Sequence, residues 1–399
     1  MEWKEVTLGE VSSKIGDGLH GTPKYDDEGS YYFINGNNLN CGKIIIKDDT
    51  KRVGIEEFVK NQKELNEQTI LVSINGTIGN VAKYNNEPCI LGKSACYINV
   101  IKEVDKEFIY YVLTSANFKR NITNEATGTT IKNVSLKQMR EYKFNIPCNI
   151  SDQRRIAFIL SSLDRKIELN NKINADLEEM AQAVFKNWFV DFEPFKDGKF
   201  VDSELGMIPE GWKVGTLGDI TKNKSAKVKE RNDVKVLSPV TTGELVLSEE
   251  YFTKQVFSSS IAKYKIVNKG DFAYNPARVN IGSLGRNEFD FDGCVSPVYV
   301  VFSVLDGYEN YFDLFRKTDF FKDSVASLAI GGVRQSLSYD DLSSIEVIIP
   351  SENAVEEFNN LNNQMKKIIK ANKLENSRLS TLRDTLLPRL MSGELEVPE

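Results

Sequence analysis

Few residues of this sequence have the types and spacing that enzymatic chemistry requires. His20 is the single histidine among 399 residues, so a site built on several histidines is excluded, and a nucleophile–histidine pair could form only there. The five cysteines are odd in number and lack C-x-x-C spacing, so neither a zinc site nor a disulfide framework is indicated. Free cysteines are most often buried as small apolar side chains, and that is the role expected here.

Two short motifs match catalytic or cofactor-binding sequences only in part. Residues 91–95 (LGKSA) contain the Gly-Lys-Ser of a phosphate-binding loop, but Glu87 occupies the position that needs the first glycine. Residues 275–278 (NPAR) lack the second proline and the aromatic residue of the N-P-P-aromatic motif of adenine methyltransferases. The chain is therefore predicted to have no catalytic residues, no metal site and no cofactor of its own.

Polar loops in the first half have residue types that suit nucleic-acid binding. Ser, Thr, Asn, Lys and His side chains can bond to phosphates and base edges, and glycine lets a ligand approach the backbone closely. Such residues cluster at 17–24 (DGLHGTPK), 35–38 (NGNN), 75–77 (NGT) and 127–133 (TGTTIKN). The candidate DNA-binding residues of this half are Gly18, His20, Gly21, Thr22, Lys24, Asn35, Asn37, Asn75, Thr77, Thr129, Thr130 and Lys132.

The second half has the densest basic run, residues 221–231 (TKNKSAKVKER), together with polar segments at 275–286 and 331–336. Arginine can pair bidentately with guanine and glutamine with adenine. For every one of these segments, the alternative is an ordinary turn or a solvated loop, and for His20 it is a cap of its own loop. The candidate DNA-binding residues of this half are Lys222, Lys224, Lys227, Lys229, Arg231, Asn275, Arg278, Asn280, Ser283, Arg286, Arg334 and Gln335.

Charge and hydropathy limit where and how the chain can act. The formal net charge is −6 at pH 7, so a nucleic-acid binder with this composition must concentrate its basic residues locally. No run of 18 apolar residues is present, and the first ten residues (MEWKEVTLGE) lack the basic-then-apolar order of a signal peptide. A cytoplasmic location without a membrane partner is expected.

The elements that position these loops occur twice. A chain of this length suits two domains, since single cores stop growing at roughly 250–300 residues. Short apolar runs separated by Gly, Asn and Thr predict strands and turns in both halves. The sequence therefore predicts an internal duplication of a whole domain and its following helix. The matched segments are 3–10 with 212–219, 74–81 with 279–286, 94–100 with 296–302, and 128–147 with 331–350.

Each module is followed by a long helix with apolar residues at heptad a and d positions, beginning at Ile156 and at Phe358. Ser151 and Ser351 give N-cap signals. Asparagine at mid-seam positions can fix register and partner choice. The alternative is that each helix packs only on its own module. The residues predicted to pair the helices are Leu163, Ile167, Asn170, Asn174, Leu177, Met365, Ile368, Asn372, Leu379 and Leu382.

The predicted fold class is α+β, with two similar globular domains of short strands joined by two long helices. The helices are expected to form an antiparallel coiled coil with pseudo-two-fold symmetry. The predicted domains are 1–150, 151–195 (helix), 196–350 and 351–399 (helix). Near the end of the first helix, the aromatic residues Trp188, Phe189 and Phe192 either receive a partner subunit or cover the helix end against the second module.

The ends of the two helices resemble one known family. Residues 181–195 (AQAVFKNWFVDFEPF), followed by 208–220 (IPEGWKVGTLGDI), resemble the middle of specificity (S) subunits of type I restriction-modification systems. Residues 382–397 (LRDTLLPRLMSGELEV) resemble the C-terminus of the same family, and 15–25 (IGDGLHGTPKY) resembles a loop of its first recognition domain. The resemblance covers the whole chain in order.

The resemblance implies two target-recognition domains, each recognising one half of a bipartite double-stranded DNA sequence. It also implies that the helices space the domains and dock two methyltransferase (M) subunits, which Trp188, Phe189 and Phe192 could contact. S-adenosylmethionine and the adenine-methylating site belong to those M subunits. ATP and Mg belong to the restriction (R) subunits of the full complex.

Three rival interpretations remain open. An autonomous nuclease or methyltransferase is disfavoured by the missing motifs, and modification by the chain alone would favour it. A coiled-coil interaction scaffold, whose modules bind protein, would fail to assemble with any M subunit. The third is an orphan specificity subunit without a restriction partner of its own.

Overall fold

Two compact units make up the chain. The computed structural model describes residues 1–126, 132–252, 254, 256–258, 260–328 and 336–397. Unit 1 comprises Met1–Asn171 with Asn372–Glu399, and unit 2 comprises Lys172–Ala371. Two long helices, α5 (Ile150–Phe189) and α11 (Glu352–Met391), each contribute one part to unit 1 and one part to unit 2.

In unit 1, the described part of the globular module has two small sheets and two strand pairs, of which β4 with β5 is one. The sheets have the orders β2-β10-β7-β8 and β6-β3-β9, and β1 pairs with β11. All pairings are antiparallel except β3 with β9. The elements are β1 (Trp3–Thr7), β2 (Ser12–Asp17), β3 (Tyr31–Ile34), η1 (Gly36–Asn38), β4 (Leu39–Asn40), β5 (Lys43–Ile44), β6 (Arg52–Val53), α1 (Ile55–Asn61), β7 (Thr69–Ser73), β8 (Val81–Lys83), β9 (Cys89–Leu91), β10 (Ala95–Val100), α2 (Lys106–Thr114), α3 (Ala116–Glu125), α4 (Leu136–Glu141) and β11 (Lys143–Pro147).

Unit 2 repeats this plan. Its main sheets have the orders β15-β22-β19-β20 and β17-β16-β21-β18, with β16 and β21 parallel, and β14 pairs with β23. The predicted duplication is thus confirmed. The elements are η2 (Glu193–Phe195), β12 (Phe200–Val201), β13 (Ile208–Pro209), β14 (Lys213–Thr216), α6 (Leu217–Ile220), β15 (Thr221–Lys224), β16 (Lys235–Pro239), β17 (Leu245–Leu247), α7 (Ser248–Tyr251), β18 (Lys265–Val267), β19 (Phe272–Tyr274), η3 (Val279–Ile281), β20 (Leu284–Arg286), β21 (Gly293–Val295), β22 (Val300–Val304), α8 (Glu309–Phe315), α9 (Asp319–Leu328), α10 (Tyr339–Ser343) and β23 (Glu346–Ile349).

The repeated opening of the two modules has a local physical cause. The Glu10 carboxylate accepts a hydrogen bond from the backbone N–H of Thr7 at 2.6 Å, and Asp219 accepts one from the N–H of Thr216 at 2.7 Å. Each bond closes the turn that follows β1 or β14, the equivalent strands of the two modules. Leu8, inside the first turn, is completely buried and fixes that turn to the core.

In the turns before β8 and β20, the glycine of unit 1 that is equivalent to Gly282 lies three residues later than the sequence motif indicates. The sequence aligned Gly76 with Gly282, each as the first glycine of a G-[ST]-[IL]-G motif. In the structure, Gly79 lies where Gly282 lies, two residues before β8 and β20 respectively, and both have positive φ (88° and 93°). A left-handed backbone favours glycine there in both turns.

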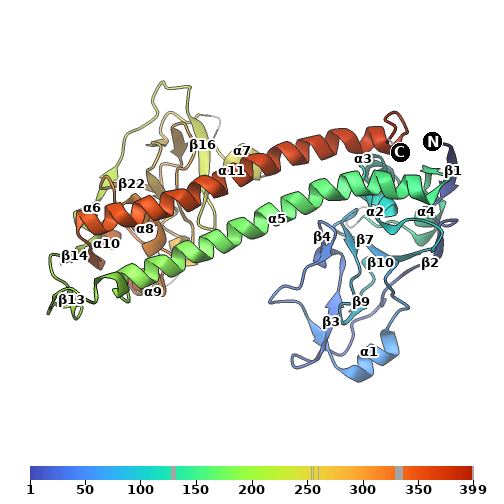
Figure 1. Cartoon of the computed structure of the whole chain (residues 1–399), viewed down its shortest axis with the longest axis horizontal. Helices are drawn as coiled ribbons and strands as arrows, with labels where there is room; N and C mark the ends of the chain where they lie inside the picture. Colours follow the sequence, from blue (N-terminus) through green and yellow to red (C-terminus); the bar gives the residue numbers. More distant parts are fainter. Residues whose placement is uncertain (127–131, 253, 255, 259, 329–335, 398–399) are drawn as a thin grey trace. The chain divides into compact units, whose positions relative to one another are not determined.

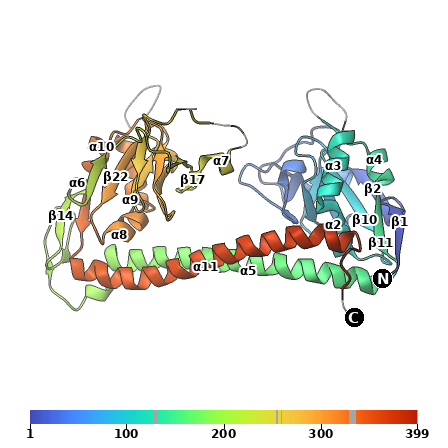
Figure 2. The same ribbon diagram turned by 90° about the horizontal axis from the view of Figure 1, so that it is seen from above.

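The long helices pair with one another in each unit. In unit 1, Asn170 of α5 donates to Asn376 of α11 at 2.9 Å, and Arg383 donates to Asp164 at 2.7 Å. Residue numbers fall along α5 as they rise along α11, so the pairing is antiparallel. In unit 2, the ring of Phe189 contacts that of Phe358 edge-on, with centroids 4.9 Å apart. Figures 1 and 2 show α5 in green and α11 in red.

The predicted seam of α11 is wrong at two residues. Ile368 and Leu382 are 47% and 46% exposed, whereas Asn362 is 1% exposed and lies on the seam. Several seam positions of α11 hold polar side chains, while apolar residues lie one position away on the exposed side. A heptad pattern assigned from apolar residues is therefore displaced by one residue at these positions. The α5 residues Asn170 and Asn174 are buried as predicted.

The N-cap predictions had mixed outcomes. The Ser351 hydroxyl accepts a hydrogen bond from the N–H of Ala354 at 3.4 Å, which fits a cap of α11. At the start of α5, however, the Asn149 side chain accepts from the N–H of Ser151 at 2.9 Å, so Asn149 takes the role predicted for Ser151.

The aromatic residues near the end of α5 belong to the core of unit 2. Phe189 is 5% exposed, and its ring contacts Trp212 at a centroid distance of 5.8 Å. Phe192 contacts the same tryptophan at 5.5 Å, and Trp188 contacts Phe358 at 6.0 Å. Of the two alternatives for these rings, packing against the second module is the one that the structure supports.

The cysteine prediction holds for three of five residues. Cys89, Cys96 and Cys294 are buried, but Cys41 and Cys148 are exposed. Across the described residues, no group of three His, Cys, Asp or Glu side chains could hold a metal ion. Within the same residues, no helix is both long enough and apolar enough to cross a membrane.

Candidate nucleic-acid interface

In unit 1, the loop that follows β2 is fixed by its backbone. The N–H of Leu19 donates to the carbonyl of Leu91 at 2.7 Å, and Leu19 bridges to Gly92. Gly18 is required at this close approach, because a Cβ at that position would lie 2.1 Å from the Leu91 carbonyl oxygen. His20 extends from this anchored loop with its side chain 61% exposed, and its Nε2 lies 2.6 Å from the Asp17 carboxylate.

Three further segments are joined to one another by hydrogen bonds, and one of them continues from Gly92, to which Leu19 bridges. The Ser94 hydroxyl donates to Oδ1 of Asn35 at 3.0 Å and accepts from the N–H of Gly36 at 2.8 Å. Gly36 in turn lies against the Ser73 and Thr77 hydroxyls, which are 3.1 Å apart. The ends of β3 and β7 and the segment after β9 therefore form one polar surface.

The turn between β7 and β8 connects to the segment before α4. The Asn75 amide donates to Oδ1 of Asn133 at 3.4 Å, and the N–H of Val134 donates to the carbonyl of Ile74 at 2.9 Å. Lys132, immediately before this connection, is exposed. The structure thus brings the predicted loops around 18–24, 35–37, 75–77 and 132 together on unit 1. The candidates exposed there are His20, Gly21, Thr22, Lys24, Asn37, Thr77 and Lys132.

In unit 2, backbone bonds hold the basic run after β15 in place. The N–H of Val228 donates to the carbonyl of Tyr264, and that of Lys229 to Ala262, both at 2.9 Å. Lys229 has a positive φ of 55° and lies in a turn near the end of the run. The lysines of the run with exposed side chains are Lys222, Lys227 and Lys229.

Two other basic residues of the run are held by acids. Lys224 donates to both oxygens of Asp271, at 2.8 and 3.0 Å, and burial raises the pKa of that carboxyl while the lysine lowers it. Arg231 pairs with Asp233 at 2.6 Å and with Asp292 at 3.1 Å. The charges of Lys224 and Arg231 are therefore both used in ion pairs within unit 2.

The turn between β19 and β20 has both exposed and buried candidates. Arg278 is exposed at the start of η3, and its N–H donates to the carbonyl of Asn275 at 2.9 Å. Ser283 is 2% exposed, and its hydroxyl donates to the Pro239 carbonyl at 2.7 Å. This burial contradicts a DNA-contact role for Ser283, because the side chain stabilises the turn from inside.

Arg286 also faces the protein. Its Nη1 donates to Oδ1 of Asn310 at 3.1 Å, and its guanidinium lies 5.8 Å from the centre of the Phe272 ring. The prediction that Arg286 pairs with a base is not supported by this placement. Asn280 is exposed on η3 and has an interaction within the chain.

A short series of contacts joins the basic run to this turn. Lys227 bridges to Lys265, whose ammonium donates to the Tyr299 carbonyl at 2.6 Å. Burial raises the pKa of the Tyr299 phenol, while the charge of Arg278 and a hydrogen bond with Asn275 lower it. Lys227, Tyr299 and Arg278 consequently belong to one surface of unit 2.

The same backbone connection occurs in both units. The N–H of Leu337 donates to the carbonyl of Pro276 at 3.1 Å, just as Val134 donates to Ile74 in unit 1. In unit 1, the segment before α4 is therefore fixed to the turn between β7 and β8. In unit 2, the segment before α10 is fixed in the same way to the turn between β19 and β20. Thr129, Thr130, Arg334 and Gln335 lie outside the described residues.

Sequence reasoning missed several residues of these surfaces. Lys93 is exposed beside Gly92, where the loop of His20 is anchored. The Gly-Lys-Ser sequence at 92–94 is a visible signal, but it predicts a nucleotide-binding loop and does not place Lys93 beside His20. Asp17, Ser94 and Tyr299 gave no signal, because only the fold brings them to the candidate residues.

Comparison with known proteins agrees with this architecture. A family model described as "Type I restriction modification DNA specificity domain" matches residues 1–179. The MjaIX specificity subunit of Methanocaldococcus jannaschii is 27% identical over 95% of this chain and 87% of its own length. The HindI specificity subunit of Haemophilus influenzae is 26% identical over 72% of this chain and 77% of its own length.

A solved structure shares the fold across nearly the whole chain. The crystal structure of a type I restriction-modification S subunit from M. genitalium aligns with a TM-score of 0.59 at 18% identity, covering 98% of this chain and 96% of that one. This likeness shows that the two chains share a fold of duplicated modules on paired helices. Residues 1–179 match a type I restriction-modification DNA specificity domain, and most of the chain is similar in sequence to specificity (S) subunits of type I restriction-modification systems.

Proposed function

We propose that this chain is an S subunit that recognises a bipartite, gapped DNA target, one half with the polar surface of each unit. The observation that carries the proposal is the repetition of one scaffold with different exposed side chains. Unit 1 presents His20, Thr77 and Lys132, whereas unit 2 presents Lys227 and Arg278 at the corresponding end of its main sheet. Recognition of two different short sequences requires a repeated scaffold with different base-contacting groups.

The remaining chemistry belongs to other subunits in this proposal. Two methyltransferase subunits dock on α5 and α11, and restriction subunits join the complex through them. The methyltransferase subunits supply S-adenosylmethionine, and the restriction subunits supply ATP and Mg. This chain is then a non-catalytic component that determines where the complex acts.

Replacing both Lys227 and Lys229 by alanine is expected to weaken binding to all duplexes alike. Each lost phosphate contact reduces the slope of log affinity against log salt by about 0.9, so the double variant should lose roughly 1.8. The measurement is fluorescence anisotropy of the methyltransferase-bound complex on specific and unrelated duplexes over a salt series. Lys213→Ala, an exposed lysine on β14, is the control. An unchanged slope would refute phosphate contact by these lysines.

Replacing Arg278 by alanine is expected to act on sequence preference instead. Loss of one bidentate base contact costs about 1–3 kcal/mol at a single base pair and leaves the other positions unchanged. Binding to a set of targets with each base pair altered in turn measures this effect. A uniform loss over the whole set would mean that Arg278 contacts phosphate and carries no sequence information.

A further inference from the structure

Asp164 and Lys366 occupy the same position in the two long helices but have opposite charges. The helices begin at residues 150 and 352, so residues 202 apart are equivalent, and position 164 corresponds to 366. Each of these side chains contacts the helix that follows the main sheet of its own module. That helix is α2 in unit 1 and α8 in unit 2.

In unit 1, Asp164 is an acceptor for donors on two sides. The Tyr111 hydroxyl of α2 donates to its Oδ2 at 2.7 Å, and Arg383 of α11 donates to its Oδ1 at 2.7 Å. Tyr111 is 3% exposed. Burial and the bond to Asp164 both raise the pKa of its phenol, so the hydroxyl keeps its proton and remains a donor.

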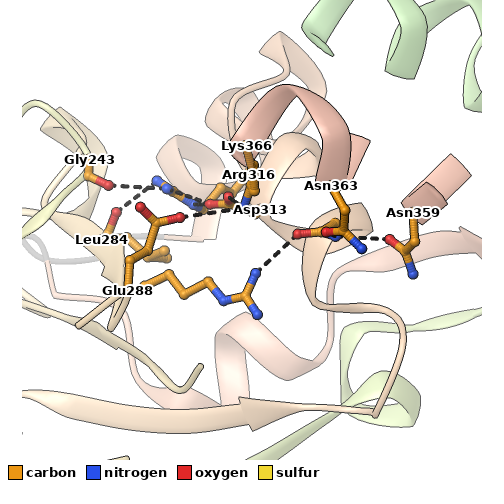
Figure 3. A network of polar contacts seen from close by, with 10 residues as sticks. Gly243, Leu284, Glu288, Asp313, Arg316, Asn359, Asn363 and Lys366 are labelled. Carbon is orange, nitrogen blue, oxygen red and sulfur yellow. Dashed lines mark hydrogen bonds and ion pairs between the residues drawn. The ribbon is translucent and has the colours of Figure 1, made fainter. Parts of the chain in front are cut away.

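In unit 2, the polarity is reversed (Figure 3). Lys366 of α11 donates to Oδ2 of Asp313 on α8 at 2.9 Å and pairs with Glu288 at 3.4 Å. Asp313 is 5% exposed, and its other oxygen accepts from Arg316 at 2.7 Å. Burial alone raises the pKa of Asp313, but the charges of Arg316 and Lys366 lower it well below its usual range.

The same network fixes the loops that carry the candidate interface of unit 2. Arg316 also donates to the carbonyls of Leu284, at the start of β20, and Gly243, between β16 and β17, at 2.8 and 3.1 Å (Figure 3). A change at position 366 would therefore disturb Asp313, then Arg316, and then the strand that follows Arg278.

We propose that these pairs form a charge code by which each globular module fits only its own helix segment. With the modules exchanged, the Asp313 carboxylate would face that of Asp164, and the Tyr111 hydroxyl would face the Lys366 ammonium. Asp313 would keep Arg316, which belongs to its own module, but it would lose the Lys366 ammonium and face a second carboxylate, and this like-charge contact is destabilising. The order of the two modules along the chain is therefore fixed by physical complementarity. This inference concerns contacts inside each unit and does not depend on DNA binding.

The test compares four full-length chains in a two-by-two design. The natural chain and a chain with segments 2–147 and 211–350 exchanged are each made with and without D164K plus K366D. These substitutions lower the thermal unfolding midpoint of the natural chain by roughly 5–10 °C. They raise that of the exchanged chain by a smaller amount, because Arg383 of α11 remains in both chains and repels Lys at position 164. Amide hydrogen exchange must locate the change in α2 and α8. Substitutions that lower both midpoints, or neither, overturn the proposal.

A second comparison keeps the proposal falsifiable if the exchanged chain does not fold. K366D and K367D make the same charge change at neighbouring positions of α11, and Lys367 is exposed. K366D must lower the midpoint by several degrees more than K367D and increase hydrogen exchange in α8. Equal effects of the two variants would overturn the charge code.

Discussion

Gly18→Ala is expected to destabilise unit 1 by about 3 kcal/mol, whereas Gly21→Ala, three residues later in the same loop, should be nearly neutral. A Cβ at position 18 would lie 2.1 Å from the carbonyl oxygen of Leu91 and 2.2 Å from its carbonyl carbon. Both atoms are backbone, so the loop must move and the hydrogen bond from Leu19 to Leu91 is lost. A Cβ at position 21 meets nothing within 4 Å.

Urea unfolding of both variants, with amide hydrogen exchange at Leu19, measures the difference. The Gly21 variant controls for the general loss of chain entropy that accompanies any glycine-to-alanine change. Similar stability of the two variants would contradict the close approach of this loop to the end of β9. Since this loop carries His20, the Gly18 variant should also lose affinity for specific DNA.

Phe358→Ala should cost unit 2 about 3–5 kcal/mol, the range for removing a fully buried aromatic side chain. Phe358 is completely buried on α11, and its ring contacts those of Phe185, Trp188 and Phe189 of α5. The cavity would open at the junction where α5 and α11 both meet the globular part of unit 2.

Phe320→Ala on α9 is the matched control, because this ring is 51% exposed and its removal should cost less than about 1 kcal/mol. Chemical unfolding followed by hydrogen exchange within residues 172–189 resolves the two variants. If Phe358→Ala were as stable as the control, the packing of Phe358 against the aromatic rings of α5 would be contradicted.

The duplicated fold could be predicted from the sequence because its signals are local. Two long heptad patterns, two similar openings and two prolines closing equivalent strands each appear within a short window. Which residues of each helix lie on the seam could be determined only from the tertiary structure. Ile368 and Leu382 are apolar and were predicted to lie on the seam, yet the fold leaves both about half exposed and buries Asn362 instead. Which face of α11 is covered depends on contacts with distant segments, and residue type alone does not determine it.

The candidate site was predicted at the level of loops and less well at the level of side chains. Glycine, asparagine and threonine mark turns by composition, and the structure brings those turns together. Residue type alone could not tell that Ser283 lies inside its turn or that Arg286 bonds to Asn310. Burial depends on contacts between distant segments, and composition does not contain them.

Mapping N6-methyladenine across the genome of the source organism tests the central claim most directly. The comparison is between the intact coding sequence, its deletion, and a version in which segment 211–350 is replaced by that of another S subunit. The account predicts a two-part, gapped methylated motif that disappears on deletion and changes in only one half after replacement. A methylation pattern that is the same in all three strains would contradict it.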